Sequence, residues 1–261
     1  MNNVKKMAEN SMFYQTFHTK LVLLRNPRFF TLLCLDFVVS FYLYALFVPR
    51  FDVVVHEFWH QTAKVADNLN GTITWLRSNP AGLKLNTPVN ETLAWFFTYH
   101  IYLWTTFIGF LRSDHLFGAV LHCLLAGIST FFALIYDFSQ IFFLHFNCFD
   151  AYATKLFFLC YHTLAVLWAL VRGKKWNPLR KRKDTVSLDT RQQFLATSLF
   201  VVLLFILPTI AVYFVVFRCL RCCVSALQAA FRLLATWPFQ VYYYKENVRN
   251  WRGEGEADHR S

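Results

Sequence analysis

Long apolar runs separated by short polar stretches are the dominant pattern along this chain. The clearest run, residues 194–217, reads FLATSLFVVLLFILPTIAVYFVVF and holds no charged side chain. An uncharged run of more than 18 residues can cross a hydrocarbon core about 30 Å thick. Four further runs, 29–48, 93–111, 116–136 and 152–171, are also mostly apolar, although 29–48 contains Asp36 and 152–171 contains Lys155. The pattern predicts an all-α protein, a polytopic transmembrane helix bundle with five to six spans.

Two segments leave the number of spans open. Residues 138–149 are rich in aromatic side chains but too short to span, so an interfacial position is expected. Residues 222–244 are long enough, but Arg232 lies at their centre, where a charge costs about 2.5–3.5 kcal/mol on insertion scales. An interfacial or re-entrant position is favoured for this segment over a sixth span.

A dense basic block, Arg172–Lys183, precedes the 194–217 run and indicates the orientation. Cytoplasmic loops retain Lys and Arg, so this block is predicted to face the cytosol. Threading the five spans from there places residues 1–28 in the cytosol and the 49–92 loop in the lumen. Arg218 and Arg221 then fall on the lumenal side, which the rule does not explain. The first apolar run is too long for a cleavable signal peptide and is predicted to be a signal anchor.

These boundaries predict a cytosolic N-terminal segment (1–28), one helical membrane domain (29–244) and a polar C-terminal tail (245–261). Composition agrees, because 56% of residues are hydrophobic and 16% are charged, against about a quarter charged in soluble domains. The net charge of +11 is explained by topology and by attraction to anionic headgroups. Since the cations lie in loops between apolar spans, no nucleic-acid partner is expected.

One metal-binding motif is present. His56-Glu-Phe-Trp-His60 matches H-E-x-x-H, in which two His on one helix face bind zinc and Glu57 acts as general base. A catalytic zinc needs a third ligand, and the sequence does not offer one convincingly. The favoured interpretation is an amphipathic interfacial helix that buries its apolar side chains, Val53, Val54, Phe58 and Trp59. A membrane zinc protease stays the alternative function, and no metal or other cofactor is expected.

Four ionisable side chains lie inside the predicted spans: Asp36, His100, His122 and His162. Such groups usually face the bundle interior. They could form a headgroup or proton site, or fix the packing through hydrogen bonds between helices, which is favoured. A lipid or solute transporter is a further alternative, but the chain shows no inverted repeat that would support it.

Two loop motifs are more individual. Asn79-Pro-Ala-Gly-Leu-Lys-Leu-Asn86 precedes the 93–111 run, where Gly82 permits a tight turn and Asn86 or Asn90 could cap the next helix. The second motif, Arg172-Gly-Lys-Lys-Trp-Asn177, follows the 152–171 run and suits a helix C-terminus with an interfacial Trp. Both are interpreted as helix-end devices, and the second could also bind an anionic surface.

These motifs carry a family resemblance. The stretches 75–86 (WLRSNPAGLKLN), 97–104 (FTYHIYLW), 172–180 (RGKKWNPLR) and 204–209 (LFILPT) resemble the subunit Q family of phosphatidylinositol N-acetylglucosaminyltransferase. The resemblance covers roughly residues 20–240.

The resemblance implies a multi-pass protein of the endoplasmic reticulum membrane. The complex transfers N-acetylglucosamine from UDP-N-acetylglucosamine to phosphatidylinositol, the first step of glycosylphosphatidylinositol anchor synthesis. Its catalytic glycosyltransferase is another subunit, so a non-catalytic, scaffolding role is expected here, with that subunit and other membrane subunits as partners and phosphatidylinositol as a candidate ligand. The residues expected to contact partner or lipid are Lys174, Lys175, Trp176, Asn177, Arg180, Gly82, Leu83, Lys84, Leu85 and Asn86.

Overall fold

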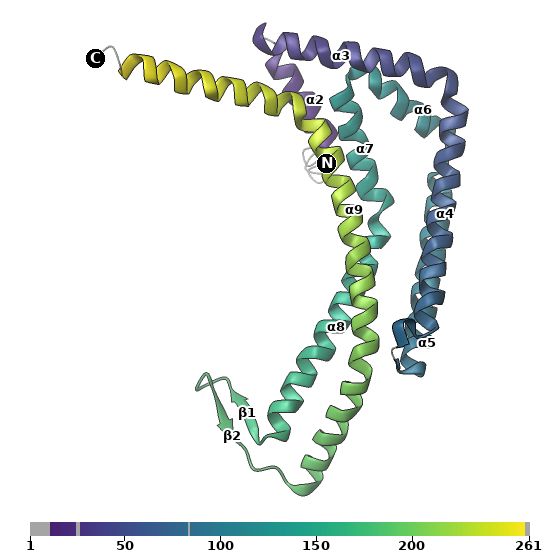
Figure 1. The fold of residues 1–261 in the computed structure, drawn as a ribbon, viewed down its shortest axis with the longest axis vertical. Helices are drawn as coiled ribbons and strands as arrows, with labels where there is room; N and C mark the ends of the chain where they lie inside the picture. The colour runs from purple at the N-terminus through teal and green to yellow at the C-terminus, as the bar shows by residue number, and fades with distance from the viewer. Residues whose placement is uncertain (1–10, 25–26, 83, 259–261) are drawn as a thin grey trace, which may run out of the picture. The chain divides into compact units, whose positions relative to one another are not determined.

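Helices make up most of the computed structural model, which describes residues 11–24, 27–82 and 84–258 (Figure 1). The predicted all-α class is confirmed, with one small β-hairpin added after α8. The helices are α2 (Met12–Leu23), α3 (Pro27–Phe47), α4 (Phe51–Arg77), α5 (Thr87–Leu111), α6 (Asp114–His122), α7 (Ile128–Phe142), α8 (Leu144–Val171) and α9 (Thr190–Asp258). Three short 3-10 turns, η1 (Val48–Arg50), η2 (Pro80–Gly82) and η3 (Cys123–Ala126), and the strands β1 (Lys174–Asn177) and β2 (Arg182–Thr185) complete the described elements.

The number of candidate spans is smaller than the sequence predicts. In the described residues, three helices are long and apolar enough to cross a membrane: Phe29–Arg77, Leu144–Val171 and Thr190–Tyr242. A fourth is added if the bent pair Thr87–Leu111 and His115–Ala126 forms one span. The segment left open as a sixth span, 222–244, belongs to the same helix as 194–217, α9. Of the five predicted spans, 116–136 is divided among α6, η3 and α7 and does not form one helix.

The segments that were expected to be short or irregular are helical. α9 has 69 residues, about 100 Å at the usual rise per residue, and includes most of the predicted polar tail. The 138–149 segment is divided between α7 and α8 at Phe143. Most of the predicted lumenal segment 49–92 is helical: the 27-residue helix α4 contains the H-E-x-x-H motif, where an amphipathic helix is expected, and continues to Arg77. Its alternation of charged and apolar residues has helical periodicity.

Glycine and proline decide where two helices end. Pro49 lies in η1 and separates α3 from α4. The predicted helix over 116–136 is instead broken at Gly127, which has φ 106° and ψ 151°. Only glycine adopts this conformation readily, so the chain changes direction there between η3 and α7.

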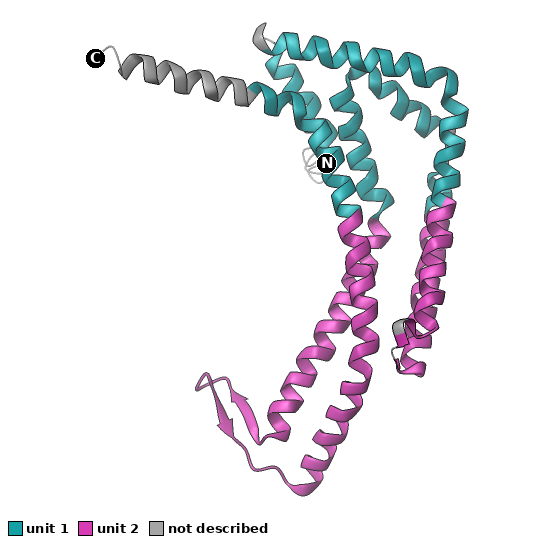
Figure 2. Ribbon diagram, viewed as in Figure 1, with its two compact units in different colours: residues 1–62, 108–143, 224–261 teal, residues 63–107, 144–223 magenta. Residues whose placement is uncertain are grey.

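The chain divides into two compact units, shown in Figure 2. Unit 1 comprises residues 1–62, 108–143 and 224–261, and unit 2 comprises 63–107 and 144–223. In unit 1, Phe29 is fully buried and its ring stacks on Phe239 and meets the edge of Tyr242. This contact joins α3 to the last third of α9.

The core of unit 2 is built on aromatic rings. Phe97 of α5 is buried, stacks on Tyr213 and Phe217 of α9, and meets the edge of Phe149 on α8. Nearer the end of α5, Trp104 lies edge-on to Phe146. The aromatic runs of the sequence therefore serve to pack α5, α8 and α9 together.

Candidate functional site

A buried ion pair lies in unit 1, between α2 and α3. Lys20 Nζ lies 2.6 Å from Asp36 Oδ2, and both side chains are almost completely buried. The same ammonium donates to Thr130 Oγ1 at 2.8 Å and to the Ala126 carbonyl oxygen at 3.1 Å. Burial lowers the pKa of Lys20, while the attraction of Asp36 opposes that shift. The three donor positions of the ammonium therefore all have partners within the protein.

Asp36 also caps α7. The backbone N–H of Ser129 donates to Asp36 Oδ1 at 3.1 Å, and the Ser129 hydroxyl donates to Oδ2 at 3.2 Å. Gly127, the N-cap residue of α7, has no side chain to do this, and a carboxylate is favourable beside a helix N-terminus. Asp137 of α7 in turn accepts from the backbone N–H groups of Met12 and Phe13, at the start of α2. Asp36 thus has the packing role that was favoured for it from the sequence.

The three His predicted inside spans differ from Asp36. His100 and His122 each place Nδ1 near a carbonyl oxygen four residues earlier, at Phe96 and Gly118, within their own helices. His100 is half-buried and its ring packs against Phe96 and Tyr152. His162 is exposed on α8. The hydrogen bonds of His100 and His122 therefore stay within their own helices and do not join two helices as predicted.

The first loop motif positions α5 against α9 within unit 2. Gly82 has φ 71°, the tight turn expected of it, and Leu85 is buried, whereas Lys84 is exposed. Leu83 lies outside the described residues. Asn86 caps α5 as predicted, because its Oδ1 accepts from the Val89 N–H at 3.2 Å.

The backbone of the same loop reaches α9. The Asn86 N–H donates to Thr209 Oγ1 at 2.9 Å, and Thr209 is fully buried. Asn90 is buried one turn further on, where its amide nitrogen donates to the carbonyl oxygens of Leu76 and Arg77. Its Oδ1 accepts from the Tyr213 hydroxyl at 2.8 Å. Thr209 and Tyr213 were not predicted as site residues, although their spacing of four places them on one face of a helix.

The second loop motif forms the β-hairpin, which follows the left-handed Gly173 (φ 67°). Strands β1 and β2 pair antiparallel, with Lys174 opposite Thr185 and Trp176 opposite Lys183. Lys174, Lys175, Trp176 and Arg180 are all exposed. The predicted contact residues of this motif are therefore brought together on one small, cationic and solvent-accessible element.

Asn177 holds the hairpin turn. Its Oδ1 accepts from the backbone N–H groups of Leu179 and Arg180, at 3.0 and 3.2 Å, and its amide donates to Asp184 Oδ2 at 2.8 Å. An Asn that bonds the backbone two residues on is a common turn device. Leu179, at the tip, is 93% exposed. Asn177 thus positions the hairpin from within, while Lys174, Lys175 and Arg180 are exposed to solvent.

The H-E-x-x-H motif lies on α4. His56 and His60 share one face of the helix, with ring centroids 6.4 Å apart, and both are exposed. Phe58 and Trp59 pack against Phe117, as an amphipathic helix predicts, although Val53 and Val54 are exposed. Among the described residues, no group of three His, Cys, Asp or Glu side chains could hold a metal ion. The described part of the chain thus gives the protease hypothesis no third metal ligand.

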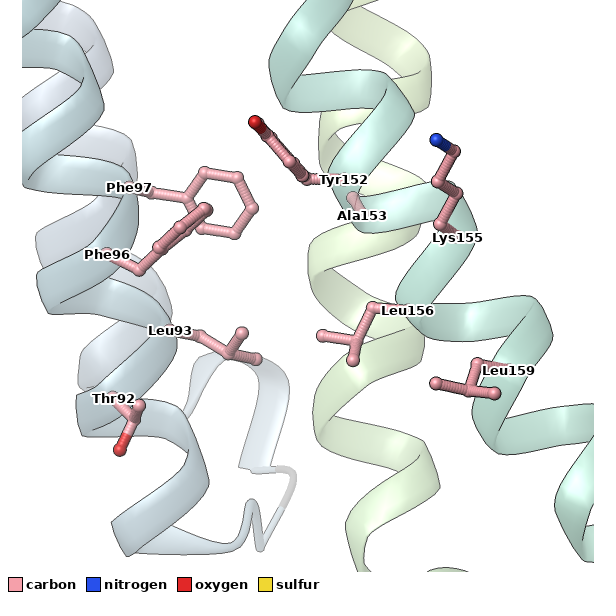
Figure 3. A pocket seen from close by; sticks show the side chains of 9 residues that line it. All are labelled: Thr92, Leu93, Phe96, Phe97, Tyr152, Ala153, Lys155, Leu156 and Leu159. Carbon is pink, nitrogen blue, oxygen red and sulfur yellow. The ribbon is translucent and has the colours of Figure 1, made fainter.

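Each unit also contains an apolar cavity. In unit 1, a cavity of about 600 Å³ lies among α3, α4, α6 and α7. In unit 2, a cavity of about 400 Å³ opens between α5 and α8 (Figure 3). Its lining is mostly leucine and aromatic, but it includes the ammonium-bearing side chain of Lys155.

Comparison with known proteins gives a consistent result. The chain matches the family described as N-acetylglucosaminyl transferase component (Gpi1) over residues 2–249. It is 41% identical over 196 residues to the human protein named phosphatidylinositol N-acetylglucosaminyltransferase subunit Q, a match that covers 74% of this chain and 26% of the relative. The mouse protein of the same name is 38% identical over 173 residues, covering 66% and 30%.

A more distant relative is the Schizosaccharomyces pombe N-acetylglucosaminyl-phosphatidylinositol biosynthetic protein gpi1. It is 29% identical over 233 residues, covering 83% of this chain and 32% of the relative. The chain therefore spans about a quarter to a third of the length of these relatives. No solved structure matches it.

The loop motif that docks on α9 and the loop motif that forms the cationic hairpin both lie inside the matched region. The names of these relatives refer to N-acetylglucosaminyl transfer or biosynthesis, not to proteolysis. With a family match that extends over nearly the whole chain, this protein belongs to the Gpi1 family of N-acetylglucosaminyl transferase components.

Proposed function

We propose that this chain is a non-catalytic, scaffolding membrane subunit of the complex that transfers N-acetylglucosamine from UDP-N-acetylglucosamine to phosphatidylinositol in the endoplasmic reticulum. The observation that carries the proposal is the family match over residues 2–249. The reaction is inferred from the names of the human and mouse relatives, and the word subunit in those names implies partner proteins.

The geometry of unit 2 supports a scaffolding role. Asn86 and Asn90 both form hydrogen bonds with α9, and Asn90 also donates to the end of α4. Such internal bonds stabilise an arrangement of helices, and an unmade bond would be costly because these groups are buried. These contacts favour a role for Asn86 and Asn90 in packing the helices of unit 2.

The hairpin is the proposed contact surface. Lys174, Lys175 and Arg180 are exposed beside the exposed Trp176, a combination that suits an acidic partner surface or anionic headgroups. The positive-inside rule places this element on the cytosolic side, where the nucleotide sugar is available. The catalytic glycosyltransferase subunit is the proposed partner.

The test is affinity purification of the tagged chain in mild detergent, followed by assay of N-acetylglucosamine transfer to phosphatidylinositol in the eluate. The wild-type chain should co-purify a glycosyltransferase and the activity. The double variant Lys174→Glu, Lys175→Glu should recover several-fold less of both. A control with the same change in charge, Lys64→Glu with Arg191→Glu, alters exposed residues outside the hairpin and should recover wild-type amounts.

Two results would contradict the proposal. Transfer by the purified chain without any other subunit would show that it is catalytic. If the hairpin variant and the control recover equal amounts of partner and activity, the hairpin is not part of the contact surface.

A further inference from the structure

The cavity of unit 2 is lined almost entirely by apolar atoms, and Lys155 is the charged residue of its lining. Leu93, Leu156 and Leu159 line its apolar part, together with the rings of Phe96 and Phe97 (Figure 3). In the same view, the Tyr152 hydroxyl and the Lys155 ammonium both lie toward the opposite end from Thr92. An apolar cavity with a lysine in its lining fits an amphiphile with a negatively charged head.

The sequence of α8 changes character at Lys155. His145, Asn147 and Asp150 lie before it, whereas residues 156–171 contain no Asp, Glu, Lys or Arg. α9 changes at the same level, because the uncharged run 194–217 ends directly before Arg218, and Arg218 Nε lies 3.2 Å from Asp150 Oδ1. Both helices thus pass from an apolar to a charged stretch beside the cavity, as helices do where the hydrocarbon core meets the headgroups.

The charge of Lys155 is not neutralised by its neighbours. Its side chain is exposed, and among the described residues no ion pair joins it to a carboxylate. Asp150, the acidic residue nearest to it along α8, pairs with Arg218 and accepts from the Thr154 hydroxyl. An ammonium beside an apolar cavity at this boundary is therefore available to an external anion.

We propose that this cavity binds one anionic glycerophospholipid, with its phosphate against Lys155 and one acyl chain along Leu156 and Leu159. A volume of about 400 Å³ lies within the range of roughly 300–1,000 Å³ typical of ligand sites. Because its lining is apolar, the cavity gives water few partners, whereas acyl chains are the material that surrounds a membrane helix. The proposal concerns a bound lipid and does not depend on which reaction the complex performs.

The experiment uses the purified full chain in nanodiscs that contain dioleoylphosphatidylserine and dioleoylphosphatidylcholine, each supplied in turn with a photoreactive diazirine in one acyl chain. Crosslinks should map to the peptides of α5 and α8 that line the cavity, and phosphatidylserine should label them more than phosphatidylcholine. Lys155→Gln should reduce this preference about tenfold, the size expected from one charge-assisted contact. Lys64→Gln, a change of an exposed lysine on α4, should leave the preference unchanged.

A second pair of variants tests the acyl position. Leu156→Trp fills the cavity and should abolish labelling of these peptides by either lipid, whereas Leu204→Trp, on an exposed part of α9 away from it, should not. Equal labelling of the Leu156→Trp variant, or a headgroup preference unaffected by Lys155→Gln, would overturn the proposal. Loss of all cavity labelling in the intact complex would overturn it too, since a partner helix would then be the occupant.

Discussion

The ammonium of Lys20 and the carboxylate of Asp36, sixteen positions apart in the sequence, meet at 2.6 Å in a buried site of unit 1. The same carboxylate caps α7, so one side chain ties three helices together. A buried ion pair need not be more stabilising than an apolar pair, but removing one partner leaves an uncompensated charge.

Lys20→Met and Asp36→Leu should each therefore lower the free energy of unfolding by about 3–5 kcal/mol. The double variant should be less destabilised than the sum of the two, because it leaves no unpaired charge. Thermal unfolding of the detergent-solubilised chain, monitored by size-exclusion chromatography after heating, measures the stability of the three variants. Additive losses would show that the two charges are not coupled.

Gly127→Ala should also destabilise unit 1. A Cβ at Gly127 would collide with the Asp36 carboxylate and approach the Lys20 ammonium, and φ 106° is strained for any other residue. Gly109→Ala is the matched control, because its position in α5 has open space around it and alanine is favoured in a helix by about 1 kcal/mol. The melting temperature should fall for the first variant and stay equal or rise for the second. A fall in melting temperature of the same size in both variants would show that Gly127 has no special role.

Tyr213→Phe should cost about 1–3 kcal/mol, since it leaves the buried Asn90 Oδ1 without the donor that now bonds it at 2.8 Å. Tyr99→Phe, at a half-exposed ring on α5, is the control and should be close to neutral. The readout is again thermal unfolding in detergent. Equal stability of the two variants would show that the link between α5 and α9 does not depend on this hydrogen bond.

An epitope inserted after Leu179 reports the side of the membrane on which the hairpin lies. This tip residue is 93% exposed, so an insertion should leave the strand pairing intact. Antibody should reach the epitope in cells whose plasma membrane alone has been permeabilised, because the basic block is expected in the cytosol. An epitope fused after residue 258 serves to compare accessibility, and staining of the hairpin only after full permeabilisation would reverse the assigned orientation.

The sequence was a good guide to helices and a poor one to their partners. Apolar runs predicted α3, α5, α8 and the first part of α9, since a run long enough for a bilayer is also long enough for a stable helix. Asn86 was predicted correctly as a helix cap, because a cap bonds its own neighbours in the chain. Family membership could likewise be recognised from motifs, which are local strings of residues.

The tertiary structure decided what depends on distant contacts. Lys20 stands in a polar segment that suggested only a cytosolic tail, and its burial follows from the packing of α2 on α7. Asn90 meets Tyr213 across 123 positions, and the break at Gly127 is stabilised by a carboxylate from α3. Helical periodicity fixes which face a residue occupies but not which helix covers that face, so these pairings, and the cavity beside Lys155, required the assembled fold.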